Sequence, residues 1–488
     1  MALITWNSCF SRWRARRRRA THCPDALSLR FRAGSSPPGA FHAELPVSSV
    51  AGPPFLVGPA EPLGFPDSDR WVRFFGFHLF LVNLPAAVRR LMVEQVEQFP
   101  KHPITLWVLQ PLIGRAIFSV NGSEWERQRR LVDQAFQVAQ LQRVFPQMEG
   151  ATSDLIARLD RLADGRSVAI DAEMTLVAAD VIVRTILSRP LAGPEAAMIF
   201  GDFARYQRRA GQAVMLSLLR VPQGLLNRYL ATHAGRIRAW IRAAIEARLA
   251  ASTADQATNA QDLLQALIEA RDPLTGSSFG LEELLDQVCF LFLAGHETSA
   301  SALAMAVYLL AQVPDAQVRL RQEVTAALAG QDGPLGFEAL RYLPYGTALF
   351  NETLRLYPPV SFFMREAQQS TTLLDQRCPV GSLLTISPWV IQRHEQNWSD
   401  PHQFRPERFL AEEASVEERR LAREAFLPFG LGPRKCPGAA FALQEALLVL
   451  AELVRRYEIL PDPGHRPDLV ARLTLRSVNG VQVKLRRL

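Results

Sequence analysis

The sequence predicts a mainly α-helical fold with small peripheral β-sheets. From residue 86 onward, apolar residues recur with helical spacing, and turn-forming pairs such as Asn121-Gly122 separate the segments. Strand-like runs are few and short, and they lie at residues 77–82, 383–391 and 473–485. Hydrophobic residues make up 48% of the 488 residues, which is enough for a large core. We therefore expect one large helical domain over residues 71–488.

The third strand-like run contains a turn signal of its own. Asn479-Gly480 is a pair typical of a tight β-hairpin, because both residues tolerate a positive φ angle. We therefore expect residues 473–485 to fold back on themselves as a hairpin.

The first 70 residues differ from the rest, and we expect a poorly ordered N-terminal extension there. Residues 1–33 contain eight arginines and one acidic residue, which together account for the whole formal net charge of +7. A stretch rich in Pro, Gly and Ser follows at about residues 33–66. An Arg-rich, acid-poor start resembles an organellar transit peptide, but a solvated tail or a start codon placed too far upstream is favoured. Because the remaining chain is neutral, nothing indicates nucleic-acid binding.

Cysteine usage and hydropathy favour a reducing compartment and argue against a membrane anchor. The five cysteines are scattered and form no C-x-x-C pair. The longest uncharged apolar runs, at residues 74–88 and 298–313, are shorter than the roughly 20 residues that span a bilayer. Three lysines against 52 arginines suggest a GC-rich bacterial genome. We expect a cytoplasmic monomer, with the mitochondrial matrix as the alternative because of the Arg-rich start.

A ten-residue stretch near the C-terminus carries the strongest chemical signal. It reads Phe429-x-x-Gly432-x-Arg434-x-Cys436-x-Gly438. Its glycines let a flat macrocycle approach the backbone, where a side chain would collide. The apolar helical segment at residues 439–455 would direct its first N–H groups toward the sulfur and stabilise a thiolate. Such a thiolate suits an axial ligand of haem iron, whereas most lone cysteines are simply buried.

This stretch resembles the segment around the proximal ligand of cytochromes P450. The resemblance covers residues 71–488 and rests on five segments in the family's order, whereas the first seventy residues depart from the family pattern. It implies the cytochrome P450 fold, in which one helical domain binds haem b (iron protoporphyrin IX) between a distal helix and the cysteine loop. Cys436 would then ligate the iron, and Phe429, Arg434 and Gly438 would contact the haem.

Two further segments resemble the parts of the family that hold the haem propionates. Trp125 and Arg129 lie four residues apart, on one helix face. In the family, such a pair directs an indole N–H and a guanidinium to one propionate, because the planar fork of arginine matches a carboxylate. The resemblance also implies that residues 360–364 pass over the haem and that Arg365 reaches the other propionate. An exposed basic helix with one aromatic residue is the alternative for the first pair.

A long apolar helical segment is interrupted by Ala294-Gly295-His296-Glu297-Thr298. Polar residues in the middle of a buried helix need a reason. Small Ala294 and Gly295 would let a ligand lie against the backbone, and His296 is expected to cap a cavity or lie at the helix surface. The resemblance implies that Glu297 and Thr298 are the acid and alcohol that deliver protons during cleavage of dioxygen. A core threonine beside a surface glutamate is the alternative.

Glu352 and Arg355 lie three residues apart and so share a helix face. An exposed ion pair of this kind would contribute little to stability. However, the segment from Pro401 to Phe409 matches the part of the family whose arginine, here Arg408, completes a buried Glu-Arg-Arg cluster. The resemblance therefore assigns these three residues to fold maintenance and haem incorporation.

The resemblance implies a haem-thiolate monooxygenase that inserts one atom of O2 into a lipophilic small molecule, by hydroxylation or epoxidation. Candidate pocket-lining segments are mostly apolar, and they lie at residues 104–118, 198–219, 290–298, 360–363 and 475–478. A peroxide-driven peroxygenase on the same fold is an alternative that the Glu297-Thr298 pair disfavours. A haem gas sensor without turnover is a second alternative, and it would normally have an output domain.

The chain includes no segment that looks like a flavin or iron–sulfur domain, so electrons would come from a separate ferredoxin or flavodoxin with its reductase. We expect an acidic partner of this kind to dock near Arg434 and Lys435 by charge complementarity. Arg127 and Arg130 are further candidates for the same basic surface.

Overall fold

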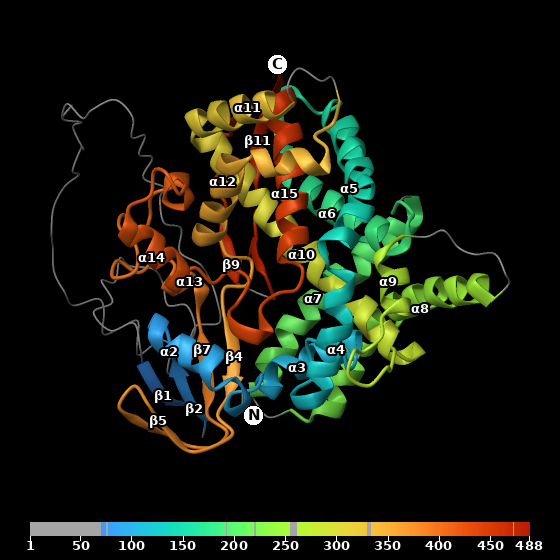
Figure 1. Cartoon of the computed structure of the whole chain (residues 1–488), viewed down its shortest axis with the longest axis vertical. Coiled ribbons are helices and arrows are strands. Elements are labelled where there is room, and N and C mark those ends of the chain that lie inside the picture. The colour runs from blue at the N-terminus through green and yellow to red at the C-terminus, as the bar shows by residue number, and fades with distance from the viewer. Residues whose placement is uncertain are drawn as a thin grey trace, which may run out of the picture. The chain divides into compact units, whose positions relative to one another are not determined.

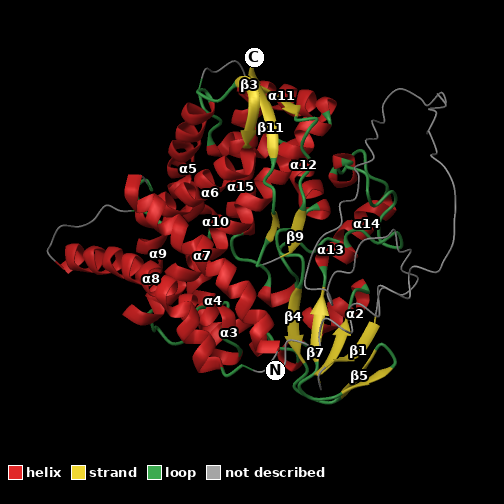
Figure 2. Ribbon diagram, turned by 180° about the vertical axis from the view of Figure 1, so that it is seen from behind, coloured by secondary structure: helices red, strands yellow, loops and turns green. Residues whose placement is uncertain are grey.

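The computed structural model describes residues 70–74, 77–191, 193–218, 221–253, 261–328, 333–471 and 473–488. The predicted N-terminal extension lies outside the described residues, apart from residue 70. Within the described residues, helices form most of the fold and the strands lie at its edges (Figures 1 and 2).

Fourteen α-helices lie within the described residues, and several begin at a side-chain cap that the sequence provides. Asp262 and Ser387 each accept a hydrogen bond from the backbone N–H three residues later. Glu323 caps another helix from a distance, because its carboxylate accepts the N–H groups of Tyr345 and Gly346. The helices are α2 (Pro85–Arg89), α3 (Pro103–Ile113), α4 (Gly122–Ala135), α5 (Val138–Leu159), α6 (Ile170–Leu187), α7 (Gly193–Leu218), α8 (Gln223–Thr253), α9 (Leu263–Glu269), α10 (Leu281–Gln312), α11 (Pro314–Leu328), α12 (Pro344–Leu356), α13 (Pro388–Ile391), α14 (Val416–Ala425) and α15 (Ala439–Arg456).

The strands form four small sheets within the described residues. The largest has the order β1-β2-β7-β4 and lies next to α2 in the lower part of Figure 1. A three-stranded sheet has the order β3-β11-β8, and the pairs β9–β10 and β5–β6 complete the set. The strands are β1 (Arg70–Phe74), β2 (Phe77–Leu81), β3 (Asp164–Ala169), β4 (Phe363–Glu366), β5 (Thr371–Leu373), β6 (Gln376–Cys378), β7 (Leu383–Ile386), β8 (Tyr457–Pro461), β9 (Leu469–Ala471), β10 (Leu475–Ser477) and β11 (Gln482–Arg487).

Two details of the strand prediction are wrong. The run at 383–391 ends as a strand at Ile386, because Pro388 has no N–H for a ladder and Ser387 caps α13 instead. The expected hairpin around Asn479-Gly480 does not form, since β10 pairs with β9 while β11 pairs with β3 and β8. Gly480 does turn the chain at φ +79°, but the side chain of Asn479 accepts the N–H of Asp468 and so ties the turn to the β9 side.

Helix α10 runs through the core and is buried over most of its length. Among the described residues it is the one helix long and apolar enough to cross a membrane, yet 78% of its most apolar window is buried inside the fold. It packs closely on α6 at Gly295, where a Cβ atom would lie 2.6 Å from Cδ1 of Ile182. The length and apolar character of α10 are therefore those of a core helix.

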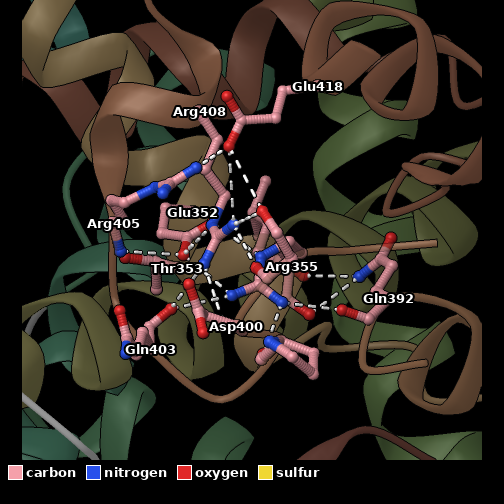
Figure 3. A network of polar contacts seen from close by, with 12 residues as sticks. Glu352, Thr353, Arg355, Gln392, Asp400, Gln403, Arg405, Arg408 and Glu418 are labelled. Atoms are coloured by element: carbon pink, nitrogen blue, oxygen red, sulfur yellow. Dashed lines mark hydrogen bonds and ion pairs between the residues drawn. The ribbon is translucent and has the colours of Figure 1, made fainter. Parts of the chain in front are cut away.

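A buried ion network joins α12 to the segment that follows α13 (Figure 3). Glu352 and Arg355 on α12 are fully buried and form two hydrogen bonds of 2.6 and 2.8 Å. Arg408, in the 3₁₀ helix η5 (Pro406–Phe409), is also fully buried and donates to Glu352 at 3.1 Å. Further N–H groups of the two arginines donate to the carbonyl oxygens of Gln392, Ser399, Asp400, Pro401 and Gln403.

Glu352→Gln should therefore lower the free energy of unfolding by about 3–5 kcal/mol, because it leaves two buried guanidinium groups without their counter-charge. The measurement is urea denaturation followed by circular dichroism. Glu338→Gln is the matched control, since Glu338 forms the same i,i+3 pair with Arg341 but both side chains are 63% exposed. The control should change stability by less than about 1 kcal/mol. Equal effects of the two substitutions would contradict the importance of the buried network.

Candidate functional site

The loop that ends at Cys436 is held in place by two glycines and a backbone hydrogen bond. Gly430 and Gly432 have φ angles of +73° and +71°, and a Cβ atom at Gly432 would overlap the carbonyl oxygen of Met92. The N–H of Cys436 donates to the carbonyl of Phe429 at 2.9 Å, which closes the loop. Within the described residues, Cys436 is the exposed free cysteine, whereas Cys289 and Cys378 are buried. Among the described cysteines, the accessible thiol therefore lies just before α15.

Helix α4 holds this loop through Arg129. Its Nη1 donates to the carbonyl oxygens of Pro433 at 3.2 Å and Lys435 at 2.6 Å, and its Nε donates to Asp133 at 2.8 Å. The ring of Trp125, one turn earlier, lies under the guanidinium of Arg434 at 4.4 Å. The pair predicted from the sequence therefore contacts the cysteine loop itself, and a propionate contact of Arg129 stays a prediction.

Three cations gather beside the loop, of which Arg365 is buried and Lys101 and Arg434 are half-buried. Lys101 and Arg365 are paired in a backbone β-bridge, Lys101 Nζ donates to the carbonyl of Phe118 at 2.9 Å, and Arg434 Nη2 donates to the carbonyl of Val120 at 3.0 Å. One guanidinium nitrogen of Arg365 and one of Arg434 are buried without a hydrogen-bond partner. Unpaired buried donors of this kind are rare in folded proteins.

Burial and mutual repulsion make this cluster electrostatically costly. Burial lowers the pKa of Arg365 to about 10, and burial together with the charge of Arg365 lowers the pKa of Arg434 to about 9. Burial, followed by the charges of Arg434 and Arg365, lowers the pKa of Lys101 well below its usual value. No carboxylate from the described residues contributes to these shifts. The cluster therefore favours an anion, and the described residues do not supply one.

The interrupted part of α10 has a local hydrogen bond at Thr298. Its hydroxyl donates to the carbonyl of Ala294 at 2.6 Å, and both residues are partly buried. Gly295 is directed at Ile182 of α6, so its missing side chain is explained by helix packing, and a ligand contact stays a prediction.

Glu297 is buried rather than solvent-facing, and two partners hold it as a carboxylate. Arg476 contacts it at 2.7 Å, Nε2 of His296 at 3.2 Å, and the hydroxyl of Thr474 donates to it at 3.1 Å. Burial alone would raise the pKa of Glu297, but the charges and hydrogen bonds of His296 and Arg476 lower it far below the usual range. The alternative of a surface glutamate is therefore wrong, because its exposed fraction is 5%.

His296 is not at the helix surface either. It is 2% exposed, and its ring contacts those of Phe200 and Phe203 on α7 and Phe292 on α10. The expectation of a surface position is wrong because α7 covers this side of α10.

The distal segment and the cysteine helix meet at Ser299, whose hydroxyl donates to Glu445 of α15 at 2.6 Å. Phe429 packs against the main core, and a Cβ atom at Gly438 would lie 3.9 Å from Sγ of Cys436. Glu352, Arg355 and Arg408 form their separate cluster on α12 and η5.

Sequence reasoning missed Lys101 and Glu445. Lys101 is one of only three lysines in the chain, a weak signal. Glu445 lies four residues after Phe441 and three before Leu448, so it interrupts the apolar face of its helix. That interruption could have identified Glu445 as a buried carboxyl group.

Comparison with known proteins decides the family. The model of a family described as cytochrome P450 matches residues 71–484. The chain belongs to the cytochrome P450 family. Cyclooctatin synthase of Streptomyces melanosporofaciens is 32% identical over 73% of this chain and 75% of its own length. Cytokinin hydroxylase of Arabidopsis thaliana is 31% identical over 77% of this chain and 73% of its own length.

A solved structure also resembles this cytochrome P450. A cyanobacterial CYP120A1 with bound retinoic acid superposes with a TM-score of 0.74, is 27% identical and covers 86% of this chain and 92% of its own. The predicted fold, mainly helical with small peripheral sheets, is confirmed. The chain is an oxidoreductase of the monooxygenase type, and its family implies a haem cofactor.

The residues of the site fit a haem. Haem carries two propionate carboxylates, which are the kind of anion that the described residues do not supply to Lys101, Arg365 and Arg434. The exposed thiol of Cys436 lies on the loop that also carries Arg434. Burial raises the pKa of this thiol, and an iron ion would favour its deprotonated form. The residues present thus include a sulfur ligand for the iron and cations for the propionates.

Arg365→Leu should raise the stability of the haem-free protein by about 1–3 kcal/mol, because it removes a buried charge that lacks a full set of partners. The same change should make haem loss at least about tenfold faster, because a propionate loses a charge-assisted hydrogen bond. Urea denaturation of the haem-free protein and haem transfer to apomyoglobin measure the two effects.

Arg355→Leu is the control, since Arg355 is equally buried but bonded to Glu352. It should lower the stability of the haem-free protein. A fall in haem-free stability for Arg365→Leu would contradict the assignment.

Proposed function

We propose that this chain is a haem-thiolate monooxygenase that holds haem b through Cys436 and inserts one atom of O2 into a lipophilic small molecule, by hydroxylation or epoxidation. One observation carries the proposal: an exposed thiol lies on a loop bordered by three buried or half-buried cations that have no acidic partner among the described residues. The bound haem would supply the activation of dioxygen, and the chain would supply ligation, protons and orientation.

Each group then has a distinct task. The closed loop and Arg129 would fix Cys436, and a thiolate there would donate electron density to the iron. Arg365, Arg434 and Lys101 would bind the propionates. Thr298 would hold a proton at its hydroxyl, which now donates to the carbonyl of Ala294 in the preceding turn of α10.

The substrate is proposed to be apolar and uncharged. Phe118 and Phe290 stack with ring centroids 5.5 Å apart, which brings two apolar side chains together between the α3–α4 connection and α10. Relatives from Streptomyces are named cyclooctatin synthase and pentalenene oxygenase, and their names motivate a panel of cyclic apolar compounds as the first screen. Of the proposed lining segments, Met198 and Val478 are 43% and 54% exposed and are poor candidates for an enclosed pocket.

Electrons are proposed to come from a separate ferredoxin or flavodoxin with its reductase. Lys435 is exposed on the cysteine loop and is the basic group best placed to meet an acidic partner. Arg127 and Arg130 are weaker candidates than the sequence indicated, because they pair with Glu283 and with Asp272, respectively. The docking surface is therefore proposed to centre on Lys435.

A cytoplasmic, monomeric enzyme remains our proposal for its location and assembly. A peroxide-driven peroxygenase is less favoured, because Thr298 retains the alcohol of the distal helix. A gas sensor is less favoured because relatives are named as oxygenases and hydroxylases.

The decisive experiment is the absorption spectrum of the dithionite-reduced protein with carbon monoxide. A Soret band strongly red-shifted from that of histidine-ligated haem is expected, and Cys436→Ser should abolish that shift because it removes the thiolate. Cys378→Ser is the control, since this cysteine is free but buried in β6. A red-shifted band that survives in Cys436→Ser would exclude Cys436 as the ligand.

Lys435→Glu should slow the first electron transfer from an acidic ferredoxin by about tenfold or more at low salt, with a smaller difference at high salt, because charge steering is screened. Stopped-flow reduction of the ferric protein at several ionic strengths is the measurement. Arg377→Glu, the same reversal at an exposed arginine of β6, is the control and should leave the rate unchanged. A rate independent of the charge at residue 435 would remove this surface from consideration.

A further inference from the structure

Residues 203–245 carry an unbalanced charge, and none of the roles described above uses it. They include eight arginines and no acidic residue, whereas residues 34–488 as a whole contain equal numbers of basic and acidic residues. This stretch forms most of α7 and most of α8, which pack against each other and against α3 (Figures 1 and 2). A positively charged region on an otherwise balanced chain indicates attraction to an anionic partner.

Half of these arginines are neutralised within the fold. Arg205 and Arg236 share Asp202, which is 1% exposed, and the other two pair with carboxylates of α10. Three further arginines have no carboxylate partner among the described residues, and the eighth lies outside those residues. The three unpaired arginines are Arg208 and Arg209 of α7 and Arg228 of α8.

The unpaired arginines lie on an ordered surface where α7 meets α8. The guanidinium of Arg209 lies 4.9 Å from the ring centroid of Tyr229 and donates to its carbonyl oxygen at 3.0 Å. The hydroxyl of Tyr229 in turn donates to Gln212 of α7 at 2.5 Å, although the residue is 38% exposed. Because these side chains are already held in place, a partner would bind them with little further loss of conformational entropy.

A groove with a volume of about 490 Å³ lies next to these arginines, between α3 and α8. Trp107 of α3 is 37% exposed and lies on the same helix face as Pro111, one turn later. Leu225, near the start of α8, is 61% exposed. The groove is lined by Gln110 and Pro111 of α3 and by Asn227, Arg228, Ala231 and Gly235 of α8.

The shape and composition of this surface favour a protein over other anionic partners. A flat bilayer surface would leave the groove empty, whereas a protruding helix or loop of a protein can fill it. Trp, Tyr and Arg are the residue types most enriched at the energetic centres of protein interfaces. A protein that binds nucleic acid commonly makes roughly 6–10 phosphate contacts, more than three unpaired arginines can provide.

We propose that the α3–α8 groove and the three unpaired arginines form a docking surface for an acidic protein, one element of which enters the groove. This partner is distinct from the electron donor, whose docking surface is proposed to centre on Lys435. The arginines pair with carboxylates of the partner, while Trp107 and Tyr229 pack against its apolar side chains. Because α3 and α7 carry the proposed pocket-lining segments at residues 104–118 and 198–219, docking holds these segments in place.

A synthetic amphipathic peptide of glutamate and leucine is the probe for this surface, and its glutamine–leucine counterpart is the neutral control. At low salt the acidic peptide should protect the backbone amides of α3 and α8 in hydrogen–deuterium exchange of the full-length protein, and the neutral peptide should not. Arg228→Glu should raise the Kd at least about tenfold, with a smaller difference at high salt. Arg377→Glu, the same reversal on β6, should leave the Kd unchanged.

Gly235→Leu tests the groove without changing any charge. A Cβ atom at Gly235 meets no atom within 4 Å, so the larger side chain fits the fold and fills the groove. This variant should weaken peptide binding at least about tenfold. Gly235→Ala is the matched control, because it brings a similar gain in helix propensity but leaves most of the groove open.

The two docking surfaces should respond independently. Reduction by an acidic ferredoxin should be unchanged in Gly235→Leu, and protection of α3 and α8 by the peptide should be unchanged in Lys435→Glu. Peptide binding that persists in both Arg228→Glu and Gly235→Leu would overturn the proposal, as would the absence of protection on α3 and α8. Tighter binding of phosphatidylglycerol vesicles than of the peptide, lost in the same variants, would identify a lipid-binding surface and would also overturn it.

Discussion

A carboxylate shared by two buried arginines positions the segment that leads to Cys436. Glu352 bonds to Arg355 and Arg408, and these arginines hold the backbone between residues 392 and 403 through carbonyl oxygens. Gln392 extends the same network, since its amide donates to the carbonyls of Leu354 and Arg355 and its oxygen accepts the N–H of Leu427 at 2.7 Å. Leu427 lies two residues before Phe429, so the cysteine loop starts from a fixed point.

The buried charges lie in two different environments, one with a full set of partners and one without. In the Glu352 network the guanidinium groups have carboxylate and carbonyl partners, which is what stability requires. Around Arg365 and Arg434, in contrast, cations are buried together and two of their nitrogen atoms lack partners. In the proposed function, the two propionates of a haem would relieve the repulsion among these cations. A locally unfavourable arrangement of this kind is typical of a functional site.

The carboxyl groups near α10 follow the same logic. Glu297 contacts Arg476, His296 and the hydroxyl of Thr474, whereas Glu445 accepts a hydrogen bond from Ser299. The charges of His296 and Arg476 lower the pKa of Glu297 despite its burial, whereas burial raises the pKa of Glu445. Because α10 is clamped between α6 and α15, these environments are fixed by rigid packing and not by the mobility of a loop.

The sequence by itself determined the helical fold class, the cysteine loop and the Glu-Arg-Arg cluster, because each depends on residue types at short, regular spacings. Only the tertiary structure decided which groups are neutralised by distant partners. Arg130 meets Asp272 and Glu297 meets Arg476 across more than a hundred residues of chain, whereas Lys101 is brought next to Arg434, a charge of the same sign. The strands on either side of Asn479 likewise pair with distant strands and not with each other. A local pattern specifies what a residue can do, but burial and long-range contacts specify its charge and its role.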